Sequence, residues 1–428
     1  MKKTIPPVKG TTDFYPELMA IRTWLYTKIR AVSEAFGYQE YEGPMLETLE
    51  LYAAKSGEEL VNEQSFVFPD RGGDMIALRP ELTPTLARMI AQRQNELAFP
   101  ARWWSFGPMW RYERPQKGRT REFFQWNIDL IGLDTPQADA EMAAIGAGFL
   151  KAVGLSPGAA TIRVNSRRLM EAELAKIGVP QGMLPKVFQL IDKLARMKVS
   201  EWDAQGLALG LSDQQLGQVR TLLEDENLWK QSDELVQFFG AAQDLGILEY
   251  LRFSASTIRG LTYYTGIIFE CFDERGSFRS VFAGGRYDNL VADVGGDPLP
   301  GVGFAMGDKV IQVLLEQEGL LPDFSRMAQI DVLVTTFSDE TMPDSLRLAA
   351  GLRDSGLRVA AYPAVVKLGK QLKYASSLGV RAVVILGPDE LEQGLATVRD
   401  MRDRSQTNLP IGELATALKR FLDQEPPS

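Results

Sequence analysis

The chain has 428 residues, of which 45% are hydrophobic and 24% are charged, a balance typical of folded domains rather than of disordered chains. This length predicts two or three domains, and the net charge of −9 argues against a protein that coats nucleic acid indiscriminately. No apolar run is long enough to cross a bilayer and the first residues lack the apolar stretch of a signal peptide, so we expect a cytoplasmic protein without a membrane partner.

Two residue types limit the chemistry that the chain can perform. Cys271 is the single cysteine, which excludes an intramolecular disulfide and any zinc site built from cysteines. The chain contains no histidine, so histidine cannot serve as general base, nucleophile or metal ligand. Catalysis would therefore have to use carboxylates, arginines, lysines, tyrosines and metal-bound phosphates.

The first 165 residues mix helical and strand patterns. Apolar residues at helical spacing predict a helix over 21–36, and Gly37 is a plausible C-terminal cap. Short β-branched and aromatic runs between Gly, Pro and Asp residues then predict strands at 65–69, 77–79 and 103–106.

The next predicted element is a hairpin with a long tip. The runs 111–112 and 123–129 flank a charged loop that contains Pro and Gly. Successive side chains of a strand point to opposite faces, so residues 125, 127 and 129 should share one face. Arginine side chains in this segment can bind phosphate oxygens bidentately, and the loop can fold over a polyanion; a solvated charged hairpin is the alternative.

From about 167 to 246 the pattern becomes helical and polar. Strands are predicted again at 266–272, 281–283 and 302–306. A strand-rich region interrupted in this way predicts one α+β domain over residues 1–325 with a helical insertion.

Residues 328–428 form a second predicted domain, after a linker around 320–327. Strand and helix patterns alternate there in βαβαβ order, which predicts an α/β domain with a mostly parallel sheet. Lys367, Lys370 and Lys373 share a helix face broadly, which suits either a ridge that contacts nucleic-acid phosphates or a solvated surface. The predicted strands and helices lie at 330–336, 344–356, 358–363, 367–379 and 381–387.

Several motifs together resemble those of class II aminoacyl-tRNA synthetases, and specifically of histidyl-tRNA synthetases. GTTDFYP with its following helix is similar to the first class II motif, and RYERPQKGRTREFFQ to the second. RGLTYYTG and AGGRYD are similar to two peptides peculiar to the histidine enzymes. The resemblance implies a catalytic domain built on an antiparallel sheet, followed by an anticodon-binding domain. It also implies a histidine–tRNA ligase that works as a homodimer through its first motif.

The resemblance further implies a role for individual residues. Arg111 and Arg259 would be catalytic, bound to the α-phosphate and the substrate carboxylate, where negative charge grows during attack on phosphorus. Arg111, Glu113 and Arg121 would bind ATP, and magnesium would bridge the ATP phosphates with few protein carboxylates and several waters as its other ligands; no individual metal-binding residue is implied. The implied histidine-binding residues are Glu81, Leu82, Thr83, Gln125, Asp129, Tyr263 and Tyr264. Glu81, Thr83 and Gln125 would receive the α-ammonium group, and Asp129 with Tyr264 the two imidazole nitrogens.

Taken singly, some of these residues have ordinary explanations. Glu81 could be a charge at a helix N-terminus, Tyr263 a core residue, and Gly284–Gly285 a turn. The chain also departs from the family pattern at two positions. Thr262 stands where the histidine-specific peptide commonly carries Asp, and Val310 stands where the third class II motif carries an arginine that packs on ATP. Lys309 or an arginine from elsewhere would then have to cover the outer phosphates.

Two other function classes compete with this reading. One is the synthetase-like regulatory subunit of ATP phosphoribosyltransferase, which shares the catalytic core but generally lacks the C-terminal domain that residues 328–428 predict. The other is a catalytically inactive nucleic-acid-binding protein, which would be expected to have lost Glu81, Arg111 or Arg259. All three are present.

Overall fold

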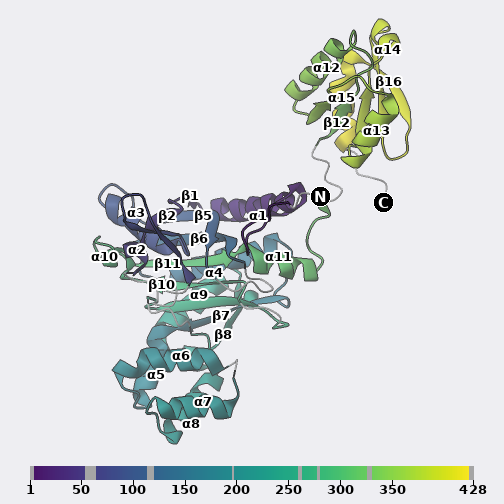
Figure 1. Cartoon of the computed structure of the whole chain (residues 1–428). Coiled ribbons are helices and arrows are strands. Elements are labelled where there is room, and N and C mark those ends of the chain that lie inside the picture. The colour runs from purple at the N-terminus through teal and green to yellow at the C-terminus, as the bar shows by residue number, and fades with distance from the viewer. Residues whose placement is uncertain are drawn as a thin grey trace. The chain divides into compact units, whose positions relative to one another are not determined.

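A computed structural model of the protein describes residues 4–53, 64–112, 120–194, 197–258, 263–276, 280–324 and 330–423. The chain divides into two compact units, Met1–Leu321 and Pro322–Ser428, which are treated separately below (Figure 1). No helix in these ranges combines the length and the apolar character that crossing a membrane requires.

A largely antiparallel sheet organises the first unit. Its strands run in the order β1-β5-β6-β11-β10-β9-β7-β8, and only the two edge pairs, β1 with β5 and β7 with β8, are parallel. The strands are β1 (Gln39–Glu40), β5 (Ala101–Trp110), β6 (Glu122–Ile131), β7 (Ala160–Ser166), β8 (Leu251–Phe253), β9 (Ile267–Asp273), β10 (Phe282–Tyr287) and β11 (Gly301–Gly307).

One face of this sheet is apolar and closed by helices. Trp126, Ile128 and Leu130 of β6 alternate onto that face and are buried in the main core. Helix α4 (Pro136–Ala152) packs there because its small residues permit a close approach: a Cβ at Gly146 would lie 2.6 Å from the Phe282 ring. The opposite face carries polar side chains and is partly covered by α3 (Thr83–Arg93) and α10 (Leu290–Asp293).

The N-terminal elements follow the sequence prediction with shifted ends. The predicted helix is α1 (Pro16–Ala35), which begins five residues earlier than expected because Pro16 suits the first helical turn. Gly37 has φ +80°, as its capping role requires. A small antiparallel sheet in the order β2-β4-β3 lies beside α2 (Leu49–Ala53). Its strands are β2 (Leu46–Thr48), β3 (Phe66–Pro69) and β4 (Met75–Leu78).

The predicted hairpin is β5–β6. At the end away from the tip, both strands extend further than predicted. The prediction of strand at 111–112 was wrong, since β5 ends at Trp110; a single further hydrogen bond, from the amide of Arg111 to the carbonyl of Arg121, continues the pairing. The glycine pair Gly284–Gly285 lies inside β10 and is not a turn. A Cβ on Gly285 would lie 2.7 Å from the Ile267 carbonyl oxygen, so close strand contact selects glycine there.

The helical insertion leaves the sheet after β7 and returns to it at β8. Trp202 connects two helices of the insertion, because its buried indole donates to the carbonyl of Leu190 in the neighbouring helix at 2.8 Å. The last long helix, α9, packs against α4, so the insertion shares the main core of the first unit (Figure 1). The helices are α5 (Arg167–Lys176), α6 (Leu184–Lys193), α7 (Val199–Ala208), α8 (Asp213–Glu224) and α9 (Asp233–Asp244), with short 3-10 turns between them. Helix α11 (Asp308–Gln317) ends the first unit.

The second unit contains the predicted βαβαβ order and an additional hairpin. The sheet order is β13-β12-β14-β15-β16, and β12 pairs in parallel with both neighbours. The expectation of a mostly parallel sheet missed β15 and β16, which pair antiparallel. The elements are β12 (Val332–Val334), α12 (Met342–Asp354), β13 (Val359–Ala361), α13 (Leu368–Ser377), β14 (Ala382–Ile385), α14 (Pro388–Glu392), β15 (Leu395–Asp400), β16 (Gln406–Pro410) and α15 (Leu414–Asp423).

Candidate active site

The polar face of the large sheet carries a row of three buried side chains from β6. Gln125, Asn127 and Asp129 alternate onto this face, as the strand period predicts. Asn127 lies between the other two, and its amide Nδ2 donates to Oε1 of Gln125 at 3.3 Å. Gln125 and Asp129 are about 13 Å apart along the strand, as the rise per residue of a strand requires.

Small residues surround this row. On β11, Gly303, Ala305 and Gly307 stand directly opposite Asp129, Asn127 and Gln125. Directly opposite residues of an antiparallel pair share a face. Because these residues are Gly and Ala, little side-chain volume stands on the sheet beside the polar row. A Cβ on Gly303 would collide with the Asp129 carboxylate. Glycine at this position therefore allows a carboxylate, or a ligand bound to it, to lie flat against the sheet.

Asp129 forms the deep end of the row. Tyr287 of β10 donates from its hydroxyl to Oδ1 of Asp129 at 2.6 Å, and both side chains are buried. Burial raises the pKa of Asp129 to about 7, although the Tyr287 hydroxyl opposes that rise. A carboxyl with a pKa near neutrality, set by its burial, is typical of functional sites.

The two described tyrosines of the RGLTYYTG peptide lie near this pair. The ring of Tyr263 meets the ring of Tyr287 edge-on, with centroids 6.4 Å apart, and packs on Tyr264 at 4.6 Å. Tyr263 is partly buried beside an apolar cluster formed by α3, α10 and the sheet. It therefore contributes to the core and to the site wall at the same time. Tyr264 is buried.

Residues 77–83, with the sequence ALRPELT, cross the other end of the row. Arg79 is fully buried above Gly107, the residue opposite Gln125, and donates to Glu42 at 2.5 Å and to the carbonyl of Pro108 at 2.9 Å. These contacts fix the chain just before Glu81, which is half-buried. Thr83 is the first residue of α3. The side chain of Leu82 is completely buried, so any contact from Leu82 to a ligand would come from its backbone.

Two arginines of the second motif, Arg111 and Arg121, lie beyond the Gln125 end of the row. Arg111 donates from Nε to the carbonyl of Pro80 at 3.0 Å, and its guanidinium lies 5.3 Å from the centre of the Phe123 ring. The motif is thereby tied to the ALRPELT segment. Arg121 stacks on Tyr112 at 4.2 Å, and its aliphatic stem runs along Gly10. Glu113, Arg259 and Thr262 lie outside the described residues.

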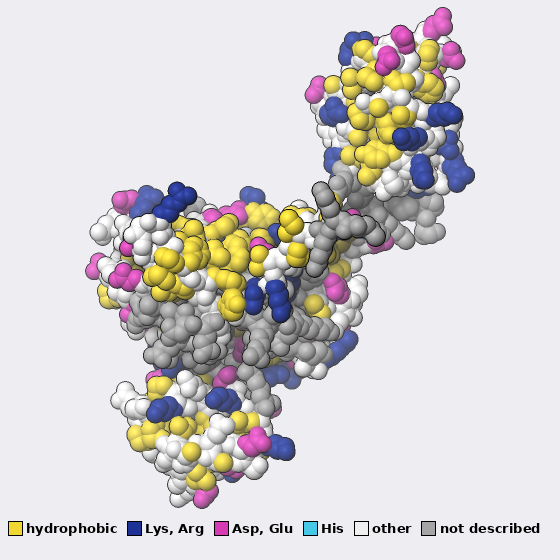
Figure 2. Space-filling model, viewed as in Figure 1, with side chains coloured by type: hydrophobic (Ala, Val, Ile, Leu, Met, Phe, Trp, Pro, Cys, Tyr) yellow, Lys and Arg dark blue, Asp and Glu magenta, His cyan; other side chains and the backbone are white. Residues whose placement is uncertain are grey.

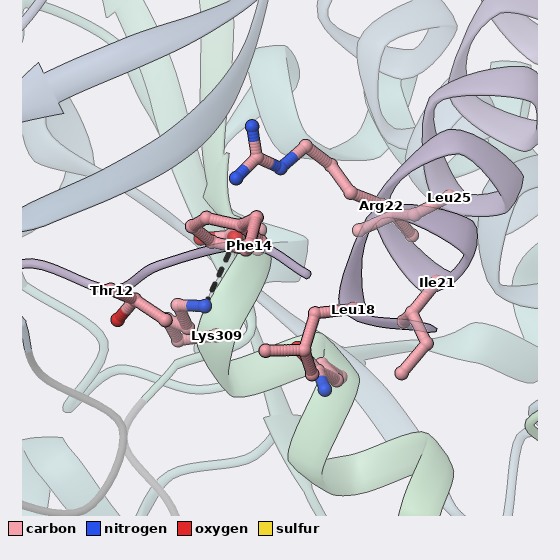
Figure 3. Close-up of a pocket in the computed structure, with 9 residues that line it drawn as sticks. Thr12, Phe14, Leu18, Ile21, Arg22, Leu25 and Lys309 are labelled. Carbon is pink, nitrogen blue, oxygen red and sulfur yellow. Dashed lines mark ion pairs between the residues drawn. The ribbon is translucent and has the colours of Figure 1, made fainter. Parts of the chain in front are cut away.

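The residues at the third motif do not face this row. Val310 packs against the main core, and Lys309 reaches Asp308 at 3.6 Å and the Phe14 ring at 4.7 Å (Figure 3). Lys309 and Phe14 line a pocket of about 140 Å³ between α1, α11 and the segment before α1. Arg22 lies in this pocket between the rings of Phe14 and Phe124. Phe124 points away from the face that carries Gln125. Lys309 is thus directed away from the polar face of the sheet.

Several polar residues of the site were not singled out from the sequence. Tyr287 lay inside the AGGRYD motif without an individual role, whereas its neighbour Arg286 faces the other way and pairs with Asp139 at 2.9 Å. The alternation of 125, 127 and 129 was the signal that could have identified Asn127. Within the described chain, the buried atoms Tyr41 Oη, Arg79 Nη2 and Ser105 Oγ have no hydrogen-bond partner. Such atoms are rare in folded proteins and suit a polar ligand here.

The lysines of the second unit are exposed. Lys370 and Lys373 lie on α13, whereas Lys367 precedes it as the N-cap residue and does not lie on the helix as predicted. All three remain available to an anionic partner.

Comparisons with known proteins cover both units. A family profile described as histidyl-tRNA synthetase matches residues 10–311, and one described as anticodon binding domain matches residues 331–421. The histidine–tRNA ligase of Haloarcula marismortui is 39% identical over 419 residues, which are 94% of this chain and 95% of that protein. The chloroplastic/mitochondrial histidine–tRNA ligase of Arabidopsis thaliana is 36% identical over 423 residues, 96% of this chain and 86% of that protein. The crystal structure of histidyl-tRNA synthetase from Nostoc sp. PCC 7120 matches with a TM-score of 0.83 at 25% identity, covering 98% of this chain and 100% of that one.

Proposed function

The chain belongs to the histidyl-tRNA synthetase family, and from that premise we propose how its residues carry out the family's reaction. Its fold is that of a class II synthetase: an antiparallel-sheet catalytic domain with a helical insertion, followed by an anticodon-binding domain. Its activity is that of a histidine–tRNA ligase, which activates histidine with ATP and transfers it to the histidine tRNA. The regulatory-subunit alternative is not favoured, because residues 331–421 match an anticodon-binding domain and the ligases above match over almost the whole chain.

The row on β6 is the observation that carries the proposed histidine site. Gln125, with Glu81 and Thr83, receives the three N–H donors of the α-ammonium group. Asp129 lies further along the same face and accepts the ring N–H of the imidazole. Tyr264, beside Tyr263, serves the second ring nitrogen, and the backbone at Leu82 closes the wall. Glycines of β11 let the substrate lie close to the sheet.

The arginines then supply the electrostatics of the chemical step. A carboxylate oxygen of histidine attacks the α-phosphorus of ATP, and the bond to pyrophosphate breaks. Arg111 and Arg259 neutralise the charge that develops on the α-phosphoryl oxygens, while Glu113 and Arg121 hold the nucleotide. No protein base is needed, because the attacking carboxylate is already ionised. The absence of histidine residues therefore costs the mechanism nothing.

Magnesium fits this site as a partner of ATP. The described residues bring together no group of three carboxylate or cysteine side chains that could hold a metal ion by themselves. We propose that the ion arrives on the ATP phosphates and keeps most of its waters, as magnesium commonly does. When bound, magnesium would neutralise charge on the phosphate oxygens.

One experiment tests the activity directly. ATP–pyrophosphate exchange should be measured with each of the twenty amino acids in turn, and histidine alone should support it. A site built to pair two ring nitrogens rejects apolar analogues strongly, because its polar groups would be left unpaired. Exchange with another amino acid, or with none, would contradict the proposal.

We also propose that the active form is a homodimer located in the cytoplasm. Large apolar side chains are exposed along α1 and the small sheet, and Figure 2 displays hydrophobic side chains gathered over this part of the first unit. Such a patch favours a two-fold interface. Sedimentation should give a dimer, and Leu18→Lys with Met19→Lys should give a monomer; a monomeric wild-type protein would refute the proposal. The exposed residues include Tyr15, Leu18, Met19, Met45, Leu46, Phe68 and Met75.

The anticodon-binding unit is expected to be separable from adenylate formation. A fragment of residues 1–321 should still support histidine-dependent exchange, because this unit carries every proposed contact to histidine and ATP. Its charging of histidine tRNA should fall several-fold, since anticodon and phosphate contacts, including those proposed for Lys367, Lys370 and Lys373, are lost. Charging by a folded fragment at full-length efficiency would show that residues 322–428 serve another purpose.

A further inference from the structure

Arg168, the second residue of α5, connects three separate elements of the first unit. Its Nη1 donates to Oε1 of Glu234 on α9 at 3.1 Å. Its Nη2 donates to Oδ2 of Asp288, just after β10, at 3.2 Å, and its Nε donates to the carbonyl of Thr265 at 3.1 Å. One guanidinium thus joins the first and last long helices of the insertion to the ends of the RGLTYYTG and AGGRYD peptides.

The partners of Arg168 are also bonded to one another. Thr265 donates from Oγ1 to Oδ2 of Asp288 at 2.6 Å, and its amide donates to the carbonyl of Arg286 at 2.8 Å. Glu234 accepts a second hydrogen bond, from Oγ of Ser166 at 2.6 Å. The network therefore holds the peptide immediately after Tyr263 and Tyr264 from both sides.

Stability alone is a weak explanation for this arrangement. The Arg168 side chain is 47% exposed, whereas Glu234 and Asp288 are 15% and 24% exposed. Because half of the arginine faces water, solvent screens its ion pairs and limits what they add to folding. Its planar fork does, however, fix three partners in one geometry, which a lysine could not do. A fixed peptide lowers the entropy that Tyr263 and Tyr264 would otherwise lose when they close on a ligand.

We propose that Arg168 is a positioning residue that holds Tyr263 and Tyr264 ready for histidine and so makes histidine binding depend on the helical insertion. This inference rests on the proposed function. Arg168 itself touches neither substrate in this account; it acts through Thr265 and Asp288. Any ligand that moved α5 against α9 would consequently change the affinity for histidine.

The test compares two arginines of the insertion. Arg168→Ala should raise the KM for histidine in ATP–pyrophosphate exchange about tenfold and weaken histidine binding in calorimetry by the same factor. The KM for ATP should stay within about twofold, because the nucleotide contacts lie at the other end of the row. Arg168→Lys should be intermediate. Arg220→Ala is the matched control, since Arg220 of α8 pairs with Asp203 of α7 and makes no described contact with the peptide.

A double-mutant cycle separates positioning from general damage. If Arg168 acts through Asp288, the Arg168→Ala and Asp288→Ala effects on histidine KM should be far from additive. An unchanged histidine KM in a stably folded Arg168→Ala variant would overturn the inference. So would equal losses for both substrates with a lowered melting temperature, which would mark a purely structural role. Failure of the wild-type protein to use histidine would instead contradict the proposed function itself.

Discussion

Replacing Arg111 with alanine is expected to lower the rate of adenylate formation by roughly 10²–10³-fold, the usual effect of removing one donor that stabilises transition-state charge. Arg111 directly follows β5, where Pro80 and Phe123 hold it next to the proposed ATP site. The charge that it would neutralise grows only as the α-phosphorus is attacked. The loss should therefore appear in the rate constant of adenylate formation, measured in single turnovers, more than in the KM for histidine.

Two further variants make this result specific. Arg259→Ala, at a position outside the described residues, should act in the same direction as Arg111→Ala. Arg93→Ala is the control, because Arg93 is an exposed arginine on α3 whose ion-pair partner is Glu96. It should leave both constants unchanged. If the Arg111→Ala effect were confined to the KM for either substrate, with turnover intact, Arg111 would be a binding residue rather than a catalytic one.

Replacing Asp129 with alanine is expected to raise the KM for histidine at least about tenfold, which corresponds to roughly 1.4 kcal/mol. The substitution leaves the ring N–H of a buried imidazole without an acceptor and leaves the Tyr287 hydroxyl without its partner. The KM for ATP should change much less. Both constants should be measured beside a thermal melt, and an unchanged histidine KM in a stably folded variant would refute the assignment.

The Asp129→Asn variant separates function from stability. Burial raises the pKa of Asp129 to about 7 in the folded protein, above its ordinary value of 3.8. A raised carboxyl pKa means that folding favours the protonated form, so its stabilising contribution is complete at low pH and is lost as pH rises through the folded pKa. Asparagine removes this loss. The variant should therefore gain melting temperature over wild type at pH 8 but not at about pH 4, while it binds histidine poorly. The same gain at both pH values would contradict the burial argument.

The local pattern of the chain was sufficient for much of this molecule. Apolar spacing identified α1, and the βαβαβ order of the second unit was legible from alternating strand and helix patterns. The strand period placed 125, 127 and 129 on one face, because side-chain direction in a strand depends only on the backbone. Motif order identified the family. The elements and the strand faces could be predicted because each depends on residues close together in the chain, and the motifs could be recognised because each is a short continuous segment.

Other features depended on contacts between distant residues and only the tertiary structure decided them. The hairpin β15–β16 was missed, since its strands are short and their pairing determines them more than their composition does. Gly284 and Gly285 read equally well as a turn until β9 and β11 were seen on either side of them.

The site itself divides along the same line. Sequence reasoning selected Asp129, but the partner that holds its carboxylate, Tyr287, is 158 residues away and was fixed by the register of β10, β11 and β6. Lys309 could have faced either side of the sheet until the segment before α1 placed Phe14 beside it. Arg168 looked like an ordinary helix residue until folding brought Glu234, Thr265 and Asp288 to its guanidinium. Direction along a strand is a local property, whereas burial, pKa and hydrogen-bond partners arise only when distant segments exclude water together.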